Sequence, residues 1–323
     1  MKALVYTGPE AMAYRDVPEP SETAGNALIR VERVGICGSD MHAFLGHDER
    51  RPAPLILGHE ACGVTTDGRR VTVNPLVTCG TCPACVVGRD NLCTSRQIIS
   101  MPPREGAFAE WLRMPEANLV EVPDGVDPAK AALAEPIACG WHAVRLGLER
   151  GPAERALVLG GGAIGLGAAL SLKAQGVEDV TLIEPNDARR AFLIERCGQK
   201  ALAEPDGTAY PLVIDGVGFA ATRATASAAA SPGGTIVHIG LGENTGGLDI
   251  RRMTLQEIAF IGTYTYTAQD FRDTAQAIFD GRLGPLDWTE ARPLSEGAEA
   301  FADIRAGRVA APKIVLVPEG ATS

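Results

Sequence analysis

The sequence has a deficit of basic residues and no long hydrophobic segment. Its 323 residues include 30 Lys and Arg against 40 Asp and Glu, which gives a formal charge of -10. An excess of negative charge repels nucleic acid and anionic lipid, so we expect neither as a partner. The most apolar of the long uncharged runs, residues 156–172, has 17 residues, of which five are glycine. This run is short for a membrane span.

A recognisable secretory signal, internal repeats, low-complexity tracts and blocks of like charge are also lacking. The first residues, MKALVYTGPEAM, contain one Lys, no long apolar stretch and an early Gly-Pro turn, unlike a secretory signal. We therefore expect a cytoplasmic protein. A reducing compartment disfavours disulfides among the eight cysteines, and four of these lie within 15 residues, which points to metal binding.

The length favours about two domains, and the pattern of the chain changes near residue 135. Residues 1–134 contain short β-like runs separated by Gly and Pro, for example 2–6, 27–34 and 71–74. This pattern, with few helical periodicities, predicts an irregular and mostly β domain.

Beyond residue 135, apolar strand-like runs alternate with helix-like segments. The strand-like runs are 156–159, 180–183, 212–214, 235–239 and 258–262, and the helix-like segments are 163–175, 187–197 and 220–230. Alternation of this kind predicts an α/β domain with a parallel sheet covered on both faces. In the tail, residues 271–279 resemble an amphipathic helix and residues 313–317 a closing strand.

Four cysteines form a short metal-binding pattern, C-x2-C-x2-C-x7-C, at Cys79, Cys82, Cys85 and Cys93. Four thiolates can surround one zinc ion as a tetrahedron, with Zn–S distances of about 2.3 Å. Because the protein fills all four positions, the predicted zinc is structural and orders a loop that has no core of its own. Free or disulfide-bonded cysteines and an iron–sulfur cluster are the alternatives.

Donor groups suited to a second zinc are scattered along the chain. Cys37 follows an apolar run, and His59 and Glu60 come 22 and 23 residues later. Singly, Cys37 and His59 would be interpreted as core residues, but Cys, His and Glu together are competent ligands of a catalytic zinc with one open position. Glu135, amid apolar residues near the expected domain junction, is a candidate third or water-bridged ligand. Cys139 competes with Glu135 for this role.

A dinucleotide-binding fingerprint, G-x-G-x-x-G, lies between a predicted strand and a predicted helix. Gly160 allows the tight turn, Gly162 lets a pyrophosphate approach the backbone, and Gly165 lets the helix pack closely on the strand. Ala163 opens the helix, whose N-terminus suits phosphate. The second strand ends in Glu184, nineteen residues after Gly165, as the fingerprint requires.

The acid at the end of the second strand bears on the choice of cofactor. Glu184 should accept hydrogen bonds from the adenosine ribose, and a 2′-phosphate would meet a carboxylate there, which favours NAD. Arg189 and Arg190 follow closely, and either could accept that phosphate, so NADP stays the alternative.

Taken together and in order, these motifs resemble the zinc-dependent medium-chain dehydrogenase/reductase family, closest to its sorbitol and polyol dehydrogenase branch. The resemblance covers nearly the whole chain. It implies a GroES-like, mostly β catalytic domain formed by residues 1–134 and 268–323, around a Rossmann coenzyme domain at 135–267. It also implies a homodimer or homotetramer.

The resemblance assigns roles to individual residues. Cys37 and His59 would bind the catalytic zinc, with Glu60 as a ligand or close neighbour and Glu135 bound directly or through water. Ser39 and His42 match a proton-relay pair. The positions that match cofactor contacts in the family are Arg189, Ile164, Ile239, Gly240, Leu241, Tyr264, Thr265 and Tyr266.

The implied activity is hydride transfer from a secondary alcohol or polyol to NAD(P)+, with one catalytic and one structural zinc per chain. The chain departs from the family after Cys62 and after Lys200, where its loops are shorter. It also has Thr265 where polyol dehydrogenases carry an arginine that holds substrate hydroxyls. Threonine, a diol or a simple secondary alcohol are therefore alternative substrates, and a cofactor-binding module without chemistry is a further alternative.

Overall fold

The computed structural model describes residues 1–321, and these form two compact units. The first comprises Met1–Glu135, Thr267–Asp280 and the residues from Thr289 onward. The second comprises Pro136–Tyr266 and Gly281–Trp288. Each unit is described by itself below.

The second unit includes a short segment that the sequence analysis placed in the catalytic domain with the rest of 268–323. Residues 281–288 group instead with the second unit, and Arg282 lies over the ring of Trp141 in that unit, 5.7 Å from its centroid. The buried side chains of this segment are Leu283, Leu286 and Trp288.

The first unit is mostly β, as predicted. Its strands are Lys2–Gly8 (β1), Ala11–Asp16 (β2), Asn26–Gly35 (β3), Leu55–Ile56 (β4), Glu60–Thr65 (β5), Arg70–Val73 (β6), Leu76–Val77 (β7), Gln97–Ile98 (β8), Trp111–Pro115 (β9), Leu119–Glu121 (β10), Thr289–Pro293 (β17) and Lys313–Val317 (β18). Its helices are Gly38–Phe44 (α1), Pro83–Val86 (α2), Pro128–Ala132 (α3), Ala268–Phe279 (α9) and Gly297–Arg305 (α10), with 3-10 turns at Asp90–Leu92 (η1), Glu116–Asn118 (η2) and Leu294–Glu296 (η3).

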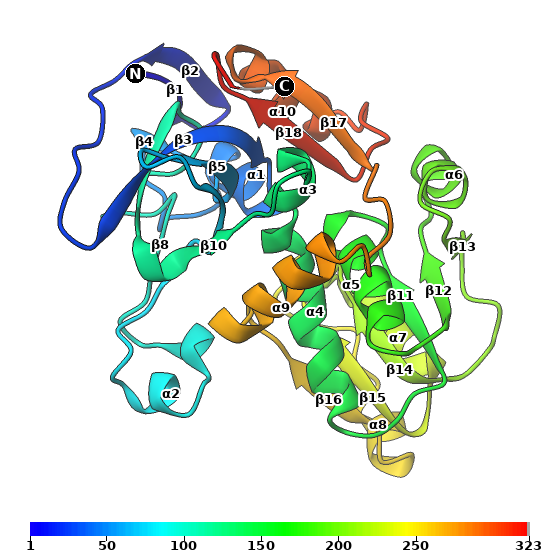
Figure 1. Cartoon of the computed structure of the whole chain (residues 1–323). Coiled ribbons are helices and arrows are strands. Elements are labelled where there is room, and N and C mark those ends of the chain that lie inside the picture. The colour runs from blue at the N-terminus through cyan, green and yellow to red at the C-terminus, as the bar shows by residue number, and fades with distance from the viewer. Residues whose placement is uncertain (322–323) are drawn as a thin grey trace. The chain divides into compact units, whose positions relative to one another are not determined.

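The main sheet of this unit joins both ends of the chain. Its strand order is β10-β6-β5-β3-β18-β17, and β9 also pairs with β3 (Figure 1). The central strand β3 runs antiparallel to both β5 and β18. A second sheet has the order β2-β1-β4. The strand predicted at residues 313–317 thus lies next to β3 and not at an edge.

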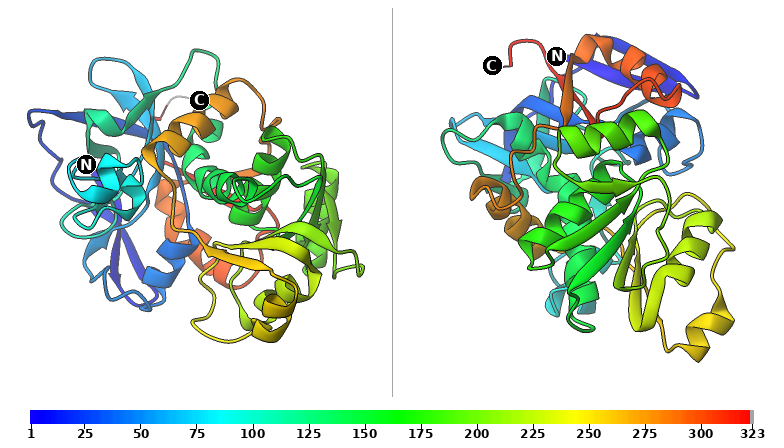
Figure 2. Two further views of the ribbon diagram at one scale, coloured as in Figure 1. Left: turned by 90° about the horizontal axis from the view of Figure 1, so that it is seen from below. Right: turned by 90° about the vertical axis from the view of Figure 1, so that its right-hand side faces the viewer.

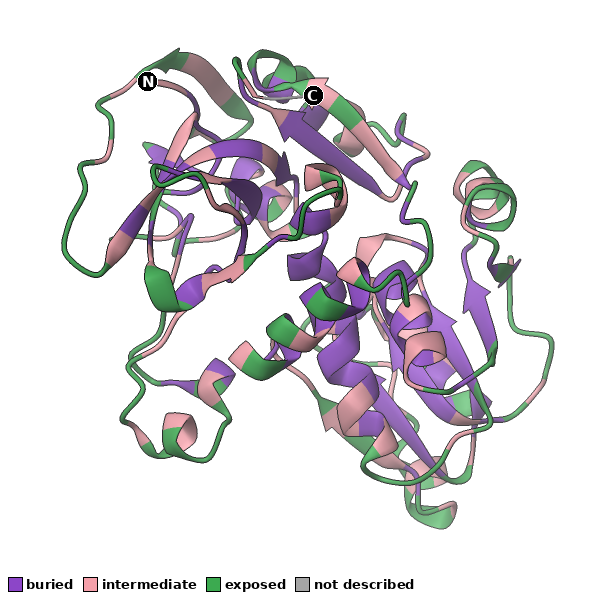
Figure 3. Cartoon of the chain, viewed as in Figure 1, coloured by how far each residue is buried: buried purple, intermediate pink, exposed green. Residues whose placement is uncertain are grey.

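Aromatic packing forms part of the core of the first unit. Phe301 of α10 is fully buried and lies 5.1 Å from Phe44 and 6.0 Å from Phe108, measured between ring centroids. The inner strands β5, β3 and β18 of the main sheet are largely buried (Figure 3). One of these strands, β5, begins with Glu60, a candidate metal ligand.

The second unit is the predicted α/β domain. Its strands are Arg155–Leu159 (β11), Asp179–Ile183 (β12), Lys200–Leu202 (β13), Tyr210–Asp215 (β14), Ala230–His238 (β15) and Ala259–Gly262 (β16). Its helices are Ala163–Ala174 (α5), Asp187–Glu195 (α6), Ala220–Ala229 (α7) and Ile250–Leu255 (α8), preceded by Ala134–Leu148 (α4), whose first two residues belong to the first unit.

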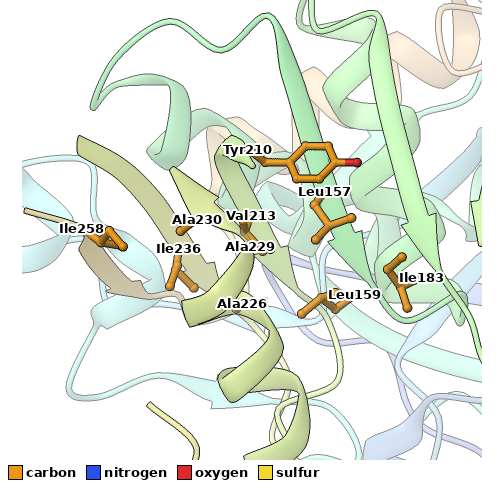
Figure 4. Packing of buried hydrophobic residues seen from close by; sticks show 10 residues of the cluster. All are labelled: Leu157, Leu159, Ile183, Tyr210, Val213, Ala226, Ala229, Ala230, Ile236 and Ile258. Carbon is orange, nitrogen blue, oxygen red and sulfur yellow. The ribbon is translucent and has the colours of Figure 1, made fainter. Parts of the chain in front are cut away.

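All paired strands of this sheet are parallel, in the order β13-β12-β11-β14-β15-β16. This is the strand order of the classical dinucleotide-binding fold. Helices α5 and α7 pack on the strands (Figure 2). Figure 4 shows the apolar side chains, among them Leu157, Val213 and Ile236, that fill the space beside the sheet. Within residues 1–321, no helix is both long and apolar enough to cross a membrane.

Candidate active site and metal centres

The four-cysteine segment forms a lobe around α2 that extends from the strands of its unit (Figure 1). The sulfur atoms of Cys79, Cys82, Cys85 and Cys93 all lie within 4.8 Å of one another. The Sγ–Sγ distances are 4.0 Å between Cys79 and Cys85, 3.5 Å between Cys82 and Cys85, and 3.5 Å between Cys93 and Cys79.

These distances fit a tetrahedral zinc site. With Zn–S bonds of about 2.3 Å, the edges of such a tetrahedron measure about 3.8 Å. Backbone N–H groups of Thr81 and Cys82 lower the pKa of Cys79 to about 6, which favours the thiolate that a metal requires. The donor set and its spacing therefore suit zinc.

Three other donor groups converge in the first unit. Cys37 precedes α1, His59 precedes β5 and Glu60 opens β5, and one donor atom from each lies within 4.8 Å of the other two. His59 and Glu60 are buried, and Cys37 is partly exposed. The structure thus brings together three of the residues predicted to bind the catalytic zinc.

Asp40 of α1 organises this cluster from behind. Its carboxylate accepts hydrogen bonds from the backbone N–H of Cys37, at 3.0 Å, and of Gly58, at 3.1 Å. Asp40 Oδ1 also lies 3.5 Å from His59 Nδ1. Burial alone would raise the pKa of Asp40, but His59, Arg51 and the Cys37 N–H together lower it. An ionised Asp40 can therefore orient the imidazole of His59.

Glu60 is held by a lysine that the sequence analysis did not identify. Lys313 Nζ of β18 lies 2.6 Å from Glu60 Oε1 and donates to the carbonyl of Ile36 at 2.8 Å. Both side chains of the ion pair are buried. Glu60 Oε2 is buried as well and has no hydrogen-bond partner within residues 1–321. A bound cation would satisfy this buried carboxylate oxygen beside Cys37 and His59.

Ser39 and His42, the predicted proton-relay pair, lie on α1, one turn apart. Ser39 is partly exposed and His42 exposed. The buried Arg51 contacts Ser39, with Nη1 3.3 Å from its carbonyl and Nη2 3.5 Å from its hydroxyl. Arg51 also pairs with Asp48 at 2.6 Å. The sequence analysis missed Arg51, because nothing in its spacing distinguishes it from Arg50.

Glu135 occupies the first turn of α4 and is buried. It is not one of the three residues whose donor atoms lie within 4.8 Å of one another. Glu135 nevertheless lies near enough to Lys313 to raise the pKa of that lysine, together with Glu60 and Cys37 and against the effect of burial. Its rival, Cys139, is also outside the cluster.

The glycine fingerprint occupies the turn between β11 and α5. Gly160 has a φ of +96°, and a Cβ on Gly165 would lie 1.8 Å from the carbonyl oxygen of Gly160. Apart from its chain neighbours, nothing lies within 4 Å of the place where a Cβ on Gly162 would stand, so its backbone borders open space. Gly162 is the N-cap of α5, and Ala163 and Ile164 follow as its first residues. These features suit a pyrophosphate at the helix N-terminus.

Glu184 follows β12 beside the fingerprint. Its carboxylate accepts hydrogen bonds from the backbone N–H of Gly161, at 3.0 Å, and of Asn186, at 2.8 Å. Arg189 lies in the first turn of α6. Arg190 donates to the carbonyl of Glu184 at 3.0 Å and pairs with Asp187.

The remaining predicted cofactor residues follow strand ends of the second unit. Ile239 and Gly240 continue from β15, where both backbone N–H groups donate to the carbonyl of Asp215, and Leu241 is 80% exposed. After β16, Thr265 has a φ of +46°, and its buried hydroxyl has no partner within the described residues. Its neighbours are Tyr264 and the buried Tyr266.

Comparison with protein families covers most of both units. The model described as the alcohol dehydrogenase GroES-like domain matches residues 23–124, and the model described as zinc-binding dehydrogenase matches residues 163–280.

Individual relatives span nearly the whole chain. L-galactonate-5-dehydrogenase of Escherichia coli K12 is 32% identical over 93% of this chain and 94% of its own. Probable D-xylulose reductase A of Arthroderma otae is 26% identical over 95% and 94%. A crystal structure of an alcohol dehydrogenase from Escherichia coli CFT073, complexed with NADH, has a TM-score of 0.88 at 26% identity and covers 98% of this chain and 99% of that chain.

The parallel sheet with its fingerprint and the mostly β unit with its two donor clusters agree with these matches. The chain belongs to the zinc-dependent medium-chain dehydrogenase/reductase family, close to its polyol dehydrogenases, and is a zinc-dependent, NAD(P)-linked alcohol or polyol dehydrogenase.

Proposed function

We propose that Cys37, His59 and Glu60 hold the catalytic zinc, with Glu135 as a direct or water-bridged ligand. The observation that carries this proposal is the convergence of three donor atoms within 4.8 Å, beside an orphaned oxygen of Glu60. Asp40 next to His59 Nδ1 leaves Nε2 as the ligand atom of the imidazole. The four cysteines of the α2 lobe hold the structural zinc.

When bound, zinc supplies Lewis-acid polarisation of the substrate hydroxyl, and the nicotinamide accepts the hydride. Ser39 takes the hydroxyl proton. Because Arg51 donates toward the oxygen of Ser39, the serine's own proton is left to pass on towards His42, whose exposure gives it access to solvent. General-base assistance of this kind contributes about 100- to 10,000-fold to the rate.

The cofactor that we propose is NAD, with NADP as the alternative. Glu184 is held by two backbone N–H groups at the end of β12, where it can accept hydrogen bonds from ribose hydroxyls. A 2′-phosphate would meet this carboxylate, and Arg190 is already engaged by Asp187 and the backbone. Gly160, Gly162, Gly165 and the N-terminus of α5 would receive the pyrophosphate.

The substrate we propose carries a secondary hydroxyl on a polyhydroxylated chain, which becomes a ketone. Two relatives are named for galactonate and xylulose, and both compounds have several adjacent hydroxyl groups. This chain has Thr265 where polyol dehydrogenases carry an arginine that holds substrate hydroxyls. Its contacts to those hydroxyls therefore differ from theirs. A threonine, diol or simple alcohol dehydrogenase is the alternative.

A substrate panel tests the proposal. Polyols, sugar acids, threonine, diols and simple secondary alcohols are each mixed with enzyme and NAD or NADP, and absorbance of the reduced cofactor is followed. We expect fastest turnover with a polyol or sugar acid and NAD. Cys37→Ser should abolish turnover while NAD binding persists, and Cys197→Ser, a change of the same chemistry in the second unit, should leave it intact. Retained turnover in Cys37→Ser would contradict the ligand assignment.

Two further expectations belong to the proposal. A homodimer or homotetramer is expected by family resemblance, and light scattering of the purified protein measures it. A cytoplasmic location is also part of the proposal, and fractionation of the source cells measures it.

A further inference from the structure

A pocket of about 450 Å³ lies in the first unit. None of the residues of the two metal clusters lines it. It is bordered by β1, β2, β4 and β9 and by the proline-containing segments 17–20 and 103–106. Pro18, Pro20, Pro54 and Pro103 line it together with Trp111. A recess of this volume is in the range of small-molecule sites, and its walls are mostly apolar.

Positive charge is concentrated in this pocket, although the chain is acidic overall. Arg15, Arg104 and Arg113 all line it. Trp111 and Arg113 are two residues apart on β9, so their side chains leave the same face of that strand. In the β1–β2 pair, Arg15 lies opposite Ala3. Ala3 and Val5 share one face of β1, so Arg15 is on the same face as Val5, which also lines the pocket.

Two of the arginines are held in place without a charged partner. Arg104 Nε donates to Gln97 Oε1 at 2.8 Å, and Arg113 Nη1 donates to the carbonyl of Ser21 at 3.3 Å. Neither forms an ion pair within residues 1–321. These neutral anchors orient the guanidinium groups and leave other N–H donors of each available.

The two guanidinium groups also repel each other. Burial first, and then the charge of Arg113, lower the pKa of Arg104. The two carboxylates that line the pocket have other contacts: Glu105 accepts the backbone N–H of Ile56 at 2.7 Å, and Glu19 lies 3.7 Å from the amino group of Met1. Arg104 is partly buried and Arg113 is exposed. A partly buried guanidinium beside a second one is unfavourable, and an anion bound between them would relieve that repulsion.

We propose that this pocket binds a small organic anion, whose carboxylate or phosphate group lies between Arg104 and Arg113 and whose apolar part packs against Trp111 and the prolines. The guanidinium forks match the geometry of both anionic groups. A recess with apolar walls suits a compact ligand with a ring or short hydrocarbon body more than an inorganic ion.

The proposed site is connected to the metal cluster by a short piece of chain. Leu55 and Ile56 of β4 line the pocket, and His59 follows three residues after Ile56. The site is nonetheless separate, because Cys37, His59 and Glu60 do not line it. It does not depend on the zinc and cofactor roles proposed above.

The experiment measures binding of phenyl phosphate, benzoate and neutral benzamide to the zinc-loaded enzyme by calorimetry. We expect phenyl phosphate and benzoate to bind, benzamide not to bind, and binding to weaken as salt is added. Arg104→Gln combined with Arg113→Gln should weaken phenyl phosphate binding at least tenfold. The control, Arg251→Gln with Arg272→Gln, removes the same charge from two exposed arginines and should bind as the wild type does.

Two results of the calorimetry would overturn the proposal: benzamide binding as tightly as benzoate, or undiminished phenyl phosphate binding in the Arg104/Arg113 variant. If that variant fails to fold, the wild-type protein alone decides. In its NMR spectrum, phenyl phosphate should shift the indole N–H signal of Trp111, which Trp111→Phe identifies, more than the signals of Trp141 and Trp288. A ligand that leaves the Trp111 signal in place binds elsewhere, and the proposal is then wrong.

Discussion

Replacement of Lys313 by methionine is expected to destabilise the zinc-free protein more than the zinc-loaded protein. The ammonium group lies 2.6 Å from Glu60, and the two side chains are only 4% and 1% exposed. Removing one partner of a buried ion pair costs about 3–5 kcal/mol, because the other charge stays buried without compensation. In a unit of this size, that corresponds to a fall in Tm of about 6–20 °C. Bound zinc supplies positive charge beside Glu60, so the loss should then be smaller.

The assay is calorimetric unfolding of both proteins, each stripped of zinc and each reloaded. Lys200→Met is the matched control: it removes an exposed pair with Asp179 at 3.3 Å, which contributes about 0–1 kcal/mol. Adding Glu60→Gln to Lys313→Met should recover much of the stability, because no buried charge is then left unpaired. The reasoning is refuted if zinc-free Lys313→Met loses no more stability than Lys200→Met, or if zinc makes no difference.

Three other predictions concern the metal centres. Cys82→Ser should lower thermal stability and leave one zinc per chain by elemental analysis; two zincs would contradict a structural role. Because Asp40 and Cys37 raise the pKa of His59 well above its usual value, against the effect of burial, a proton competes with zinc there. Zinc affinity at that site should therefore fall as the pH is lowered through the raised pKa of His59. Competition with a chelator measures the affinity, and an affinity that does not change with pH would contradict this prediction. Gly35→Ala places a Cβ 2.0 Å from Glu60 Oε2 and should weaken zinc binding at the catalytic site alone. Zinc titration measures this, with Gly38→Ala as the control, because a Cβ at Gly38 meets nothing within 4 Å.

Sequence patterns predicted the fold of the second unit well because its signals are local. The run from β11 through the fingerprint to β12 alternates apolar strand, glycines and helix within about thirty residues, and the structure confirms that alternation. Helix α4 was not predicted. Its residues are mostly buried on every side, and Gly140 packs against the backbone of Ala168, so the helix has no polar face from which to recognise a 3.6-residue period.

The candidate site was predictable to the extent that ligand chemistry is visible in residue type. Cys37, His59 and Glu60 were selected as possible zinc ligands from their chemistry and spacing, and the structure brings them together. Lys313 was not, because it is 253 residues from Glu60 in sequence and opens an otherwise apolar strand. Spacing along the chain contains no information about which strands will become neighbours in a sheet.

The position of β18 beside β3 explains why Glu60 is both fixed and available. Gly35 of β3 pairs with Glu60 of β5, and the lack of a side chain at Gly35 leaves room for Oε2. On the opposite flank of β3, β18 brings Lys313 to Oε1. Lys313 therefore compensates one oxygen, and the other, beside Cys37 and His59, has no hydrogen-bond partner in the part of the chain that the structure describes. Because Lys313 stays paired with Oε1, a cation can bind or release Oε2 without leaving an isolated charge in the interior.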